Sequence, residues 1–334
     1  MEYGYRKENL AKFTGGLKPK ERKEQDLKNA RIIIANRSFV FKNLHELPKI
    51  DVLICDEVHQ CTASSTLEYI ENCPAKIKIG CSGTIPKEKF NYWTLLGTFG
   101  KVLYREEVTK LQSQGFISKL RITLLDICHQ EIQNNRHYLF HTDSLHKYKP
   151  DENGNSEVLF NEAFAAEQDF YEKKSFELYE PVLKYLNNLD GNIMVLFDRI
   201  ETGKNLFEQT KELVTNKTAY YIDGSTDVKE REFARQECEK SGNNILVGNV
   251  SVIGTGINIK RLSHIVFLCN SKSHSRTIQA IGRVLRLHSS KNEAHLIEVR
   301  YNFKYSQRHY DERFQLYRET YGKRRPDEII NLTI

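Results

Sequence analysis

Short apolar runs alternate with longer polar stretches along most of this 334-residue chain. In runs such as VLIC at 52–55 and IVFLC at 265–269, apolar residues follow one another directly instead of alternating with polar ones. This pattern is typical of strands in a parallel sheet that is covered on both faces. We expect strands at 31–35, 52–55, 77–81, 122–125, 193–197, 219–222, 245–247, 264–269 and 294–298.

Stretches with helical character separate these runs, for example at 175–188 and 227–241. Strand–helix alternation predicts an α/β fold with doubly wound parallel sheets. Two sets of elements are recognisable, and we expect a first lobe over 1–114 and a second over 115–334. A segment at about 129–180, which contains the turn-forming KPDENGN, is expected to be an insertion or a bridge.

Composition narrows the class of protein. Hydrophobic residues make up 39% and charged residues 28%, which excludes wholesale disorder and a collagen-like chain. The net charge, 50 − 44 = +6, permits a polyanionic partner without requiring one. We find no apolar run of about 18 residues, and therefore expect no membrane segment. Seven cysteines without a Cys-x-x-Cys pair favour free thiols in a reducing cytoplasm.

Asp56-Glu57-Val58-His59 directly follows the apolar run 52–55. Ligands of α/β sheets bind at the carboxyl ends of the strands, where these acids are expected to lie. An aspartate there can hold Mg²⁺ through water, and the adjacent glutamate can polarise an attacking water. Alone, the pair is a weak signal, because a solvated loop after a strand often carries acidic residues.

Two more polar segments follow apolar runs. Ser82-Gly83-Thr84 comes after 77–81, and Gly254-Thr255-Gly256-Ile257-Asn258 comes after 245–247. Each could be an ordinary turn, because serine and glycine favour turns. The alternative is that each segment has a function. The hydroxyls of Ser82 and Thr84 would relay the nucleotide state, and the glycine loop at 254–258 would approach a ligand closely.

QAIGRVLR at 279–286 is the most specific element. On a helix, Gln279, Arg283 and Arg286 would share one face. Arginines in such a row can neutralise charge on a transferring γ-phosphate. The alternative is a solvated basic helix face. Tyrosines and phenylalanines among basic residues at 304–325 could likewise contact nucleic acid or pack on the second lobe.

These four segments occur in one order, and the chain resembles a superfamily 2 helicase or translocase over about 31–300. DEVH resembles motif II, SGT motif III, GTGIN motif V and QAIGRVLR motif VI. Within the superfamily the chain is similar to the phage UvsW type of branched-DNA helicase. The segments that carry this similarity are GTFGKVLYREEVTKLQSQGFISKLRITLL, YYIDGSTDVKEREFAR, VSVIGTGINIKRLSHIVF and TIQAIGRVLRLHSSK.

The resemblance implies two RecA-like lobes that bind ATP and Mg²⁺ between them. Asp56 would hold the Mg²⁺ shell, Glu57 would position the hydrolytic water, and His59 would couple the nucleotide site to motif VI. Arg283 and Arg286 would be arginine fingers. Gln279 would be a catalytic residue, and Gly256 and Asn258 would lie at the nucleotide edge of the second lobe. Ser82 and Thr84 would couple hydrolysis to lobe movement. The residues implied to bind DNA are Gly15, Gly16, Asn36, Arg37, Ser38 and Thr255.

One expected motif is missing from the sequence, because Gly-x-x-x-x-Gly-Lys-Ser/Thr does not occur. We therefore expect the first lobe to be incomplete at its N-terminus and the chain alone to hydrolyse little ATP. Three explanations stay open: a split gene whose upstream fragment carries the P-loop, a truncated reading frame, or a decayed relative.

The predicted function is ATP-dependent unwinding or translocation on branched, forked or single-stranded DNA, in the host cytoplasm if the protein is phage-encoded. A non-hydrolysing DNA-binding or regulatory fragment is the alternative. A restriction translocase subunit shares these motifs, but the sequence shows no nuclease constellation of acids and lysine.

Overall fold

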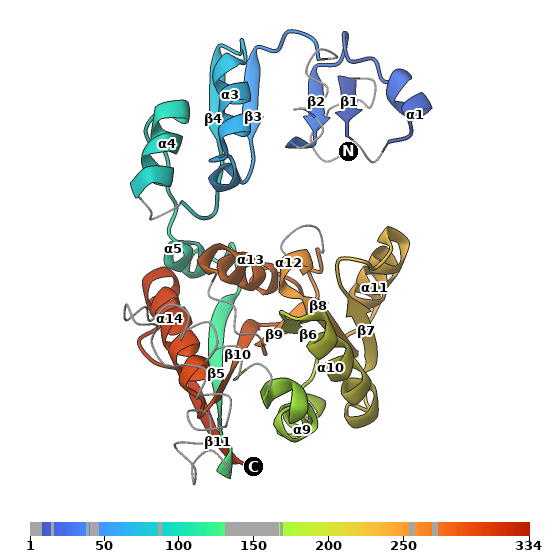
Figure 1. Cartoon of the computed structure of the whole chain (residues 1–334), viewed down its shortest axis with the longest axis vertical. Coiled ribbons are helices and arrows are strands. Elements are labelled where there is room, and N and C mark those ends of the chain that lie inside the picture. Colours follow the sequence, from blue (N-terminus) through green and yellow to red (C-terminus); the bar gives the residue numbers. More distant parts are fainter. Residues whose placement is uncertain are drawn as a thin grey trace, which may run out of the picture. The chain divides into compact units, whose positions relative to one another are not determined.

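The computed structural model describes residues 9–14, 17–37, 40, 47–85, 89–130, 167, 170–253, 258–268 and 273–334. The chain forms two compact units, Met1–Arg105 (unit 1) and Glu106–Ile334 (unit 2) (Figure 1). The boundary precedes the expected one at 114/115 because helix α5 (Val108–Ser113) packs with unit 2. There Val108 and Ile117 contact the main apolar core.

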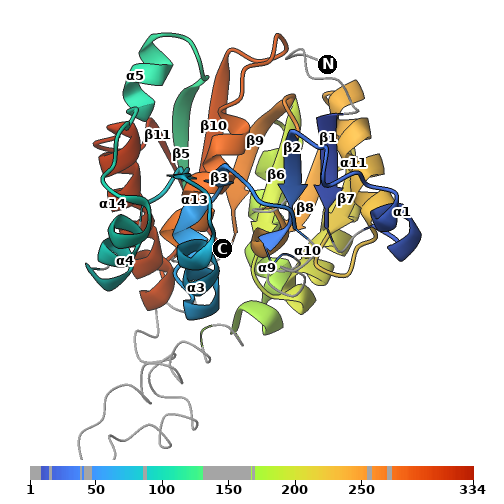
Figure 2. The same ribbon diagram turned by 90° about the horizontal axis from the view of Figure 1, so that it is seen from above.

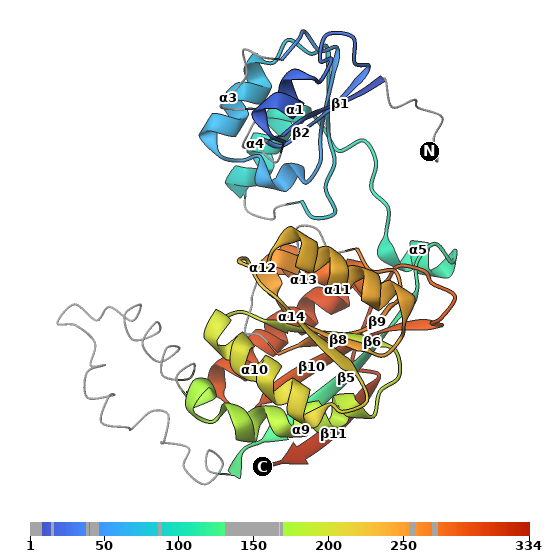
Figure 3. The ribbon, with the colours of Figure 1, turned by 90° about the vertical axis from the view of Figure 1, so that its right-hand side faces the viewer.

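Unit 2 is built on one seven-stranded parallel sheet with the order β11-β5-β10-β9-β6-β8-β7 (Figures 1 and 3). This confirms the predicted α/β fold with a parallel sheet. The strands are β5 (Lys119–Cys128), β6 (Asn192–Phe197), β7 (Thr218–Ile222), β8 (Asn244–Asn249), β9 (Leu262–Phe267), β10 (Glu293–Tyr301) and β11 (Glu328–Thr333).

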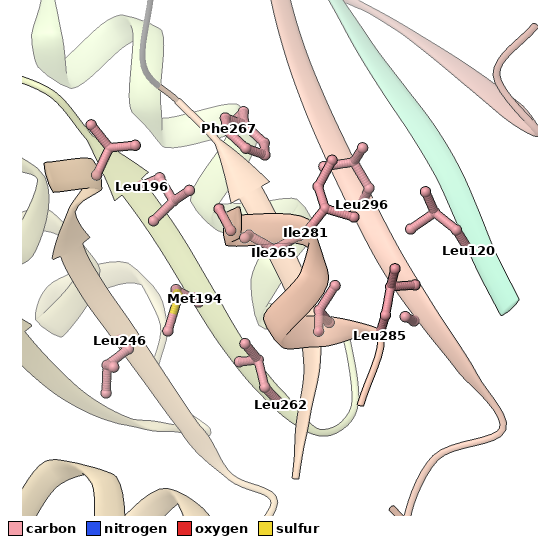
Figure 4. Close-up of a cluster of buried hydrophobic side chains, with 14 of the residues drawn as sticks. Leu120, Met194, Leu196, Leu246, Leu262, Ile265, Phe267, Ile281, Leu285 and Leu296 are labelled. Carbon is pink, nitrogen blue, oxygen red and sulfur yellow. The ribbon is translucent and has the colours of Figure 1, made fainter. Parts of the chain in front are cut away.

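Helices cover both faces of this sheet, as the continuous apolar runs predict. Helices α9 (Ser175–Asn187) and α10 (Ile200–Leu213) cover one face, while α11 (Val228–Lys240), α13 (His274–Val284) and α14 (Lys304–Tyr321) cover the other. The short α12 (Val250–Ile253) follows β8. Residues of β6 alternate between the two cores: Met194 faces α13 and Val195 faces α9. Figure 4 shows Ile281 and Leu285 packed over this sheet.

The aromatic residues of α14 are part of the core. Tyr310, Phe314, Tyr317 and Tyr321 recur every three or four residues and are all buried against the sheet. The helix therefore uses its aromatic face for packing, and of the two interpretations of 304–325 the structure supports the packing one.

Unit 1 contains two small parallel sheets. Strand β1 (Leu10–Phe13) pairs with β2 (Ile32–Ala35), and β3 (Val52–Cys55) pairs with β4 (Ile77–Gly80). The helical elements are α1 (Pro19–Lys23), η3 (Val58–Gln60), α3 (Ser64–Asn72) and α4 (Lys89–Phe99) (Figure 2).

One face of β3 and β4 is uncovered among the described residues, unlike the expected two-sided burial. Val58, Cys61, Ile70 and Leu95 form a small core on the covered side. The opposite side chains remain exposed, and Ile54 is 65% accessible. The exposed apolar residues of the strands are Ile32, Ile34, Val52, Ile54, Ile77 and Ile79.

A buried ion pair joins β10 to α14 in unit 2. Arg313 donates from Nη2 to Glu298 Oε2 at 2.7 Å and from Nε to Oε1 at 3.0 Å, and the two side chains are 3% and 0% exposed. The Tyr317 hydroxyl also donates to Glu298, and the Arg313 guanidinium lies 5.7 Å from the Phe267 ring centroid. The carboxylate is thus fully hydrogen-bonded, which offsets the cost of burying its charge.

Replacing Arg313 with methionine should leave Glu298 buried without its cation. We expect the free energy of unfolding of unit 2 to fall by about 3–5 kcal/mol, measured by urea denaturation with far-UV circular dichroism. Arg308→Ala is the control on the same helix, because its pair with Glu312 is exposed and should contribute less than about 1 kcal/mol. Equal effects of the two variants would contradict the prediction. Fluorescence of Trp93, the single tryptophan, reports unit 1 separately.

A second prediction concerns acid stability. Burial, assisted by nearby His295, lowers the pKa of His264 to about 3, and the two rings are 4.8 Å apart. The folded pKa lies below the unfolded value of 6.5, so stability is lost as pH falls below about 6.5. His264 should account for about 2 kcal/mol of destabilisation between about pH 6.5 and pH 5.

His264→Asn should remove that dependence, whereas His274→Asn, at an exposed position, should retain it in the same denaturation assay. The comparison with a variant is needed because Glu167 changes the stability with pH in the opposite direction to His264. Burial raises its pKa to about 7, so its contribution to stability is lost as pH rises from about 4.5 to 7. An unchanged acid slope in His264→Asn would refute the assignment.

Candidate functional site

The Asp56-Glu57-Val58-His59 segment forms a tight loop directly after β3. Asp56 Oδ1 accepts a hydrogen bond from the Glu57 N–H at 2.9 Å, which fixes one carboxylate oxygen at the strand end. Glu57 has φ of 49°, in the left-handed region that non-glycine residues rarely adopt. Its Oε2 lies 3.3 Å from His59 Nδ1. The loop therefore holds its acids in a conformation that costs backbone energy.

Ser82 and Thr84 contact this loop. Ser82 Oγ lies 2.8 Å from His59 Nδ1, donates to the Thr84 carbonyl at 2.6 Å and accepts from the Thr84 N–H at 3.1 Å. Thr84 Oγ1 lies 3.4 Å from the same histidine nitrogen. The structure thus brings the DEVH and SGT segments together, and His59 is the residue that joins them.

The backbone reinforces this contact. Cys81 N donates to the Cys55 carbonyl at 2.8 Å, and Val58 N donates to the Cys81 carbonyl at 2.9 Å. A Cβ on Gly80 would lie 3.1 Å from Val58 and 3.2 Å from Phe99, so a small residue suits this position. The ends of β3 and β4 therefore fix the distance between the two segments.

Arg37 has a partner that the sequence did not reveal. Its guanidinium donates to the Gln60 carbonyl, at the end of the DEVH loop. Neighbouring Asn36 is exposed, and its N–H donates to the Phe13 carbonyl at 3.2 Å. Gly15, Gly16 and Ser38 lie outside the described residues.

Gln279 and Arg283 lie one turn apart on the half-buried side of α13, while Ala280, Ile281 and Val284 anchor the helix in the core. The helix ends at Val284, so the expectation that Arg286 continues the same helical face is wrong.

The C-terminal end of α13 has two tethers. Lys291 Nζ donates to the Val284 carbonyl at 2.5 Å, which satisfies an acceptor that continued helix would have used. Buried Ser118 donates its N–H to the Leu285 carbonyl at 2.7 Å and its hydroxyl to the Arg286 carbonyl at 3.4 Å. No sequence pattern indicated these long-range contacts.

Arg286 and Asn258 are brought together in unit 2. Arg286 Nη1 donates to Asn258 Oδ1, which links the GTGIN and QAIGRVLR segments. Thr255 and Gly256 lie outside the described residues. The candidate residues therefore form two sets, one at the strand ends of unit 1 and one around α13 in unit 2.

The chemistry of unit 1 suits Mg²⁺ only in part. Among the described residues, no three His, Cys, Asp or Glu side chains are grouped to hold a metal ion. Asp56 alone fits a Mg²⁺ that takes its other ligands from water and phosphate oxygens. Over the same ranges, no helix is both long and apolar enough to cross a membrane.

Two family models match the chain. The model described as "Type III restriction enzyme, res subunit" matches residues 2–87, and "Helicase conserved C-terminal domain" matches 177–288. The first range contains Asp56 to Thr84, and the second contains Gln279 to Arg286. Together with the parallel-sheet fold, these two matches support a superfamily 2 helicase.

Within that superfamily the chain is similar to the UvsW type. It is 25% identical over 289 residues to "ATP-dependent DNA helicase uvsW" of Enterobacteria phage T4, covering 85% of this chain and 52% of that protein. It is 23% identical over 271 residues to "Probable helicase D10" of Escherichia phage T5, covering 80% and 53%. The chain spans about half the length of these curated relatives.

Solved structures share the fold. A fragment of a putative HsdR subunit of a type I restriction enzyme from Vibrio vulnificus has a TM-score of 0.60 at 16% identity, covering 100% of this chain and 59% of that one. RNA-bound Dbp5 of S. cerevisiae has 0.58 at 12% identity, covering 98% and 71%. At these identities the likeness concerns the RecA-like helicase fold alone.

Glycine at position 57 should relieve the left-handed strain of the DEVH loop. We expect Glu57→Gly to be more stable than Glu57→Ala by about 1 kcal/mol, because only glycine adopts that φ without cost. Both variants lack the carboxylate, so the difference between their free energies of unfolding reports the cost of the backbone conformation. Urea denaturation followed by Trp93 fluorescence measures unit 1, and equal stability of the two variants would show that the loop is unstrained.

Proposed function

We propose that this chain is the downstream part of an ATP-dependent DNA helicase or translocase that acts on branched or forked DNA. The observation that carries the proposal is the contact of His59 with Ser82 and Thr84, next to Asp56 and Glu57. It joins the acids suited to nucleotide chemistry to hydroxyls on a second segment. The relatives with helicase names support the same class.

In this proposal Asp56 holds the water shell of Mg²⁺, and Glu57 orients the hydrolytic water. The ion, when bound with ATP, neutralises developing charge on the phosphates. In unit 2, Gln279, Arg283 and Arg286 would supply donors to nucleotide phosphates, with Asn258 orienting Arg286 and Gly256 at the nucleotide edge. An arginine in that role is worth about 10³–10⁵ in turnover.

His59, Ser82 and Thr84 form the coupling element of the proposal. A change at Glu57 would reach Ser82 through the single Nδ1 of His59, because that atom lies within 3.3 Å of both side chains. Thr84 lies on the same nitrogen, so rearrangement of one hydroxyl alters the other. This gives hydrolysis a short route from the acids to a second segment of unit 1.

DNA contact is proposed for Gly15, Gly16, Asn36, Arg37, Ser38 and Thr255, mainly through phosphates. Such contacts give little sequence preference and strong salt dependence. The bond from Arg37 to Gln60 would connect a DNA contact to the loop that carries Asp56.

The exposed apolar side chains of β2 and of the β3–β4 sheet support a partner that carries a P-loop. Ile32, Ile34, Val52, Ile54, Ile77 and Ile79 are exposed, and such a face exposed to water is a solubility liability. A segment that adds helices and further parallel strands would bury these side chains, and its P-loop lysine would supply the phosphate contact that this sequence lacks.

Two other functions can be distinguished experimentally from an ATP-dependent helicase. A non-hydrolysing DNA-binding fragment would bind DNA in a salt-dependent way without stimulated ATPase. A restriction translocase subunit is favoured by the family model that matches residues 2–87, and would require a nuclease partner.

The test is ATPase turnover with forked DNA, for the chain alone and mixed with a fragment carrying a P-loop. We expect little turnover by the chain alone and DNA-stimulated turnover by the mixture. Glu57→Gln and Arg283→Ala should each reduce the turnover of the mixture by about 10³-fold or more while DNA binding changes less than about twofold. Arg318→Ala, exposed on α14, is the matched control.

Two outcomes would overturn the proposal. Turnover by the isolated chain equal to that of complete helicases would remove the need for a P-loop partner. Salt-dependent DNA binding by the mixture without any ATPase would select the non-hydrolysing alternative.

A further inference from the structure

Lys291 joins two segments of unit 2 that are separate in the sequence. Its Nζ donates to the Val284 carbonyl at the end of α13 and to the Leu262 carbonyl at the start of β9, both at 2.5 Å. Both acceptors are backbone carbonyls and not carboxylates, so this side chain holds two stretches of backbone together. The proposed function assigns no role to this lysine.

The two segments joined by Lys291 carry the pair formed by Asn258 and Arg286. Asn258 lies four residues before Leu262, and Arg286 lies two residues after Val284. The Arg286 guanidinium donates to the Asn258 side-chain oxygen across this junction. The lysine bridge therefore connects the backbone of both partners, within a few residues of each.

Packing fixes the two ends of the lysine bridge. The residues at or next to its acceptors lie in one apolar core and are at most 3% exposed: Ile259, Leu262, Val284 and Leu285. Carbonyls at the C-terminal end of a helix lack partners within the helix and carry partial negative charge, so an ammonium is a favourable donor there. The segment from Val284 to Lys291 is thus closed into a loop, and Arg286 lies within it.

The ammonium is held beside a second cation. Burial lowers the pKa of Lys291 to about 8, opposed by the charge of Glu239 and assisted by that of Arg286. The two carbonyl bonds keep Lys291 in place in spite of the repulsion from Arg286. Replacing Lys291 with methionine would remove that repulsion together with both bonds. These effects on stability oppose each other, so stability is a poor measure of what the lysine does.

We propose that Lys291 is a positioning residue that sets the place of Arg286 relative to Asn258. It holds the first residue of β9 against the last residue of α13, and this fixes the backbone from which the Arg286 guanidinium reaches the Asn258 oxygen. Buried Ser118 completes the arrangement, because its hydroxyl donates to the Arg286 carbonyl at 3.4 Å. The kinetic consequence rests on the proposed function of Arg286 at nucleotide phosphates, whereas the positioning itself does not.

The first test measures the positioning in the isolated chain. Hydrogen exchange followed by mass spectrometry reports the amides of Ser118 and Leu285, whose hydrogen bonds lie at this junction. We expect Lys291→Met to speed their exchange by about tenfold, because the bonds that close the junction are lost. Lys260→Met, at an exposed position two residues before Leu262, is the matched control and should leave the exchange unchanged. Unchanged exchange in Lys291→Met would overturn the proposal.

The second test measures ATPase of the chain mixed with the P-loop fragment. A displacement of about 1 Å in a group at the reacting centre can cost about 10²-fold in rate. We expect Lys291→Met to lower kcat by about 10- to 100-fold while the KM for ATP changes less than about threefold, because Arg286 acts on charge that develops during phosphoryl transfer. Lys291→Arg keeps the charge and the donors and should recover at least about threefold of the lost rate.

A double variant distinguishes positioning from general damage to unit 2. If Lys291 acts through Arg286, Lys291→Met should change kcat by less than about twofold in a chain that already carries Arg286→Ala. Additive losses would show that the lysine affects turnover by another route, and the proposal would then be wrong.

The two proposals fail in different ways. Faster exchange in Lys291→Met, combined with no ATPase in the mixture of unchanged proteins, would sink the proposed function and leave the positioning intact. Full turnover by Lys291→Met in an active mixture would refute the positioning of Arg286. If circular dichroism shows Lys291→Met to be unfolded, Ser118→Ala replaces it, because it removes only the hydroxyl bond to the Arg286 carbonyl. It should lower kcat by about threefold or more, and an unchanged kcat would refute the arrangement.

Discussion

Parallel strand pairing is the constraint on which the candidate site depends. Because parallel strands point the same way, their carboxyl ends lie at one edge of the sheet. The β3–β4 register, with Cys55 opposite Gly80, therefore brings the loop after each strand to the same place. The bonds from Cys81 to Cys55 and from Val58 to Cys81 then set how far apart the two loops lie. The His59–Ser82 contact follows from that register.

Much of unit 2 could be predicted from its apolar runs, because strands buried on both faces are nearly all apolar. The run expected at 193–197 became Asn192–Phe197, and every residue of it is buried. Strand β11 was not predicted, since this edge strand alternates and keeps Glu328 and Ile329 exposed. Strand β1 was missed for a similar reason, being four residues with a lysine in the middle. Edge position and short length weaken the periodic signal.

The site was predictable to the level of residue type and no further. Carboxylates and hydroxyls at strand ends, and arginines in a helical segment, could be chosen because the chemistry of these residue types is known from the sequence itself. Ser118 and Lys291 could not, because their role is to hold the end of α13 through carbonyls that have no sequence signature. The left-handed turn at Glu57 was equally hidden, since non-glycine residues rarely adopt a positive φ and nothing in the sequence marks this one.

Arg37 links the DEVH loop to the proposed DNA contact through one guanidinium. It donates to the Gln60 carbonyl, and it is also proposed to contact DNA phosphates. A phosphate that draws the guanidinium away would break its bond to Gln60, at the end of the loop that carries Asp56. Linkage is reciprocal, so a change in the loop that strengthens or weakens this bond would change the affinity of Arg37 for phosphate by the same factor.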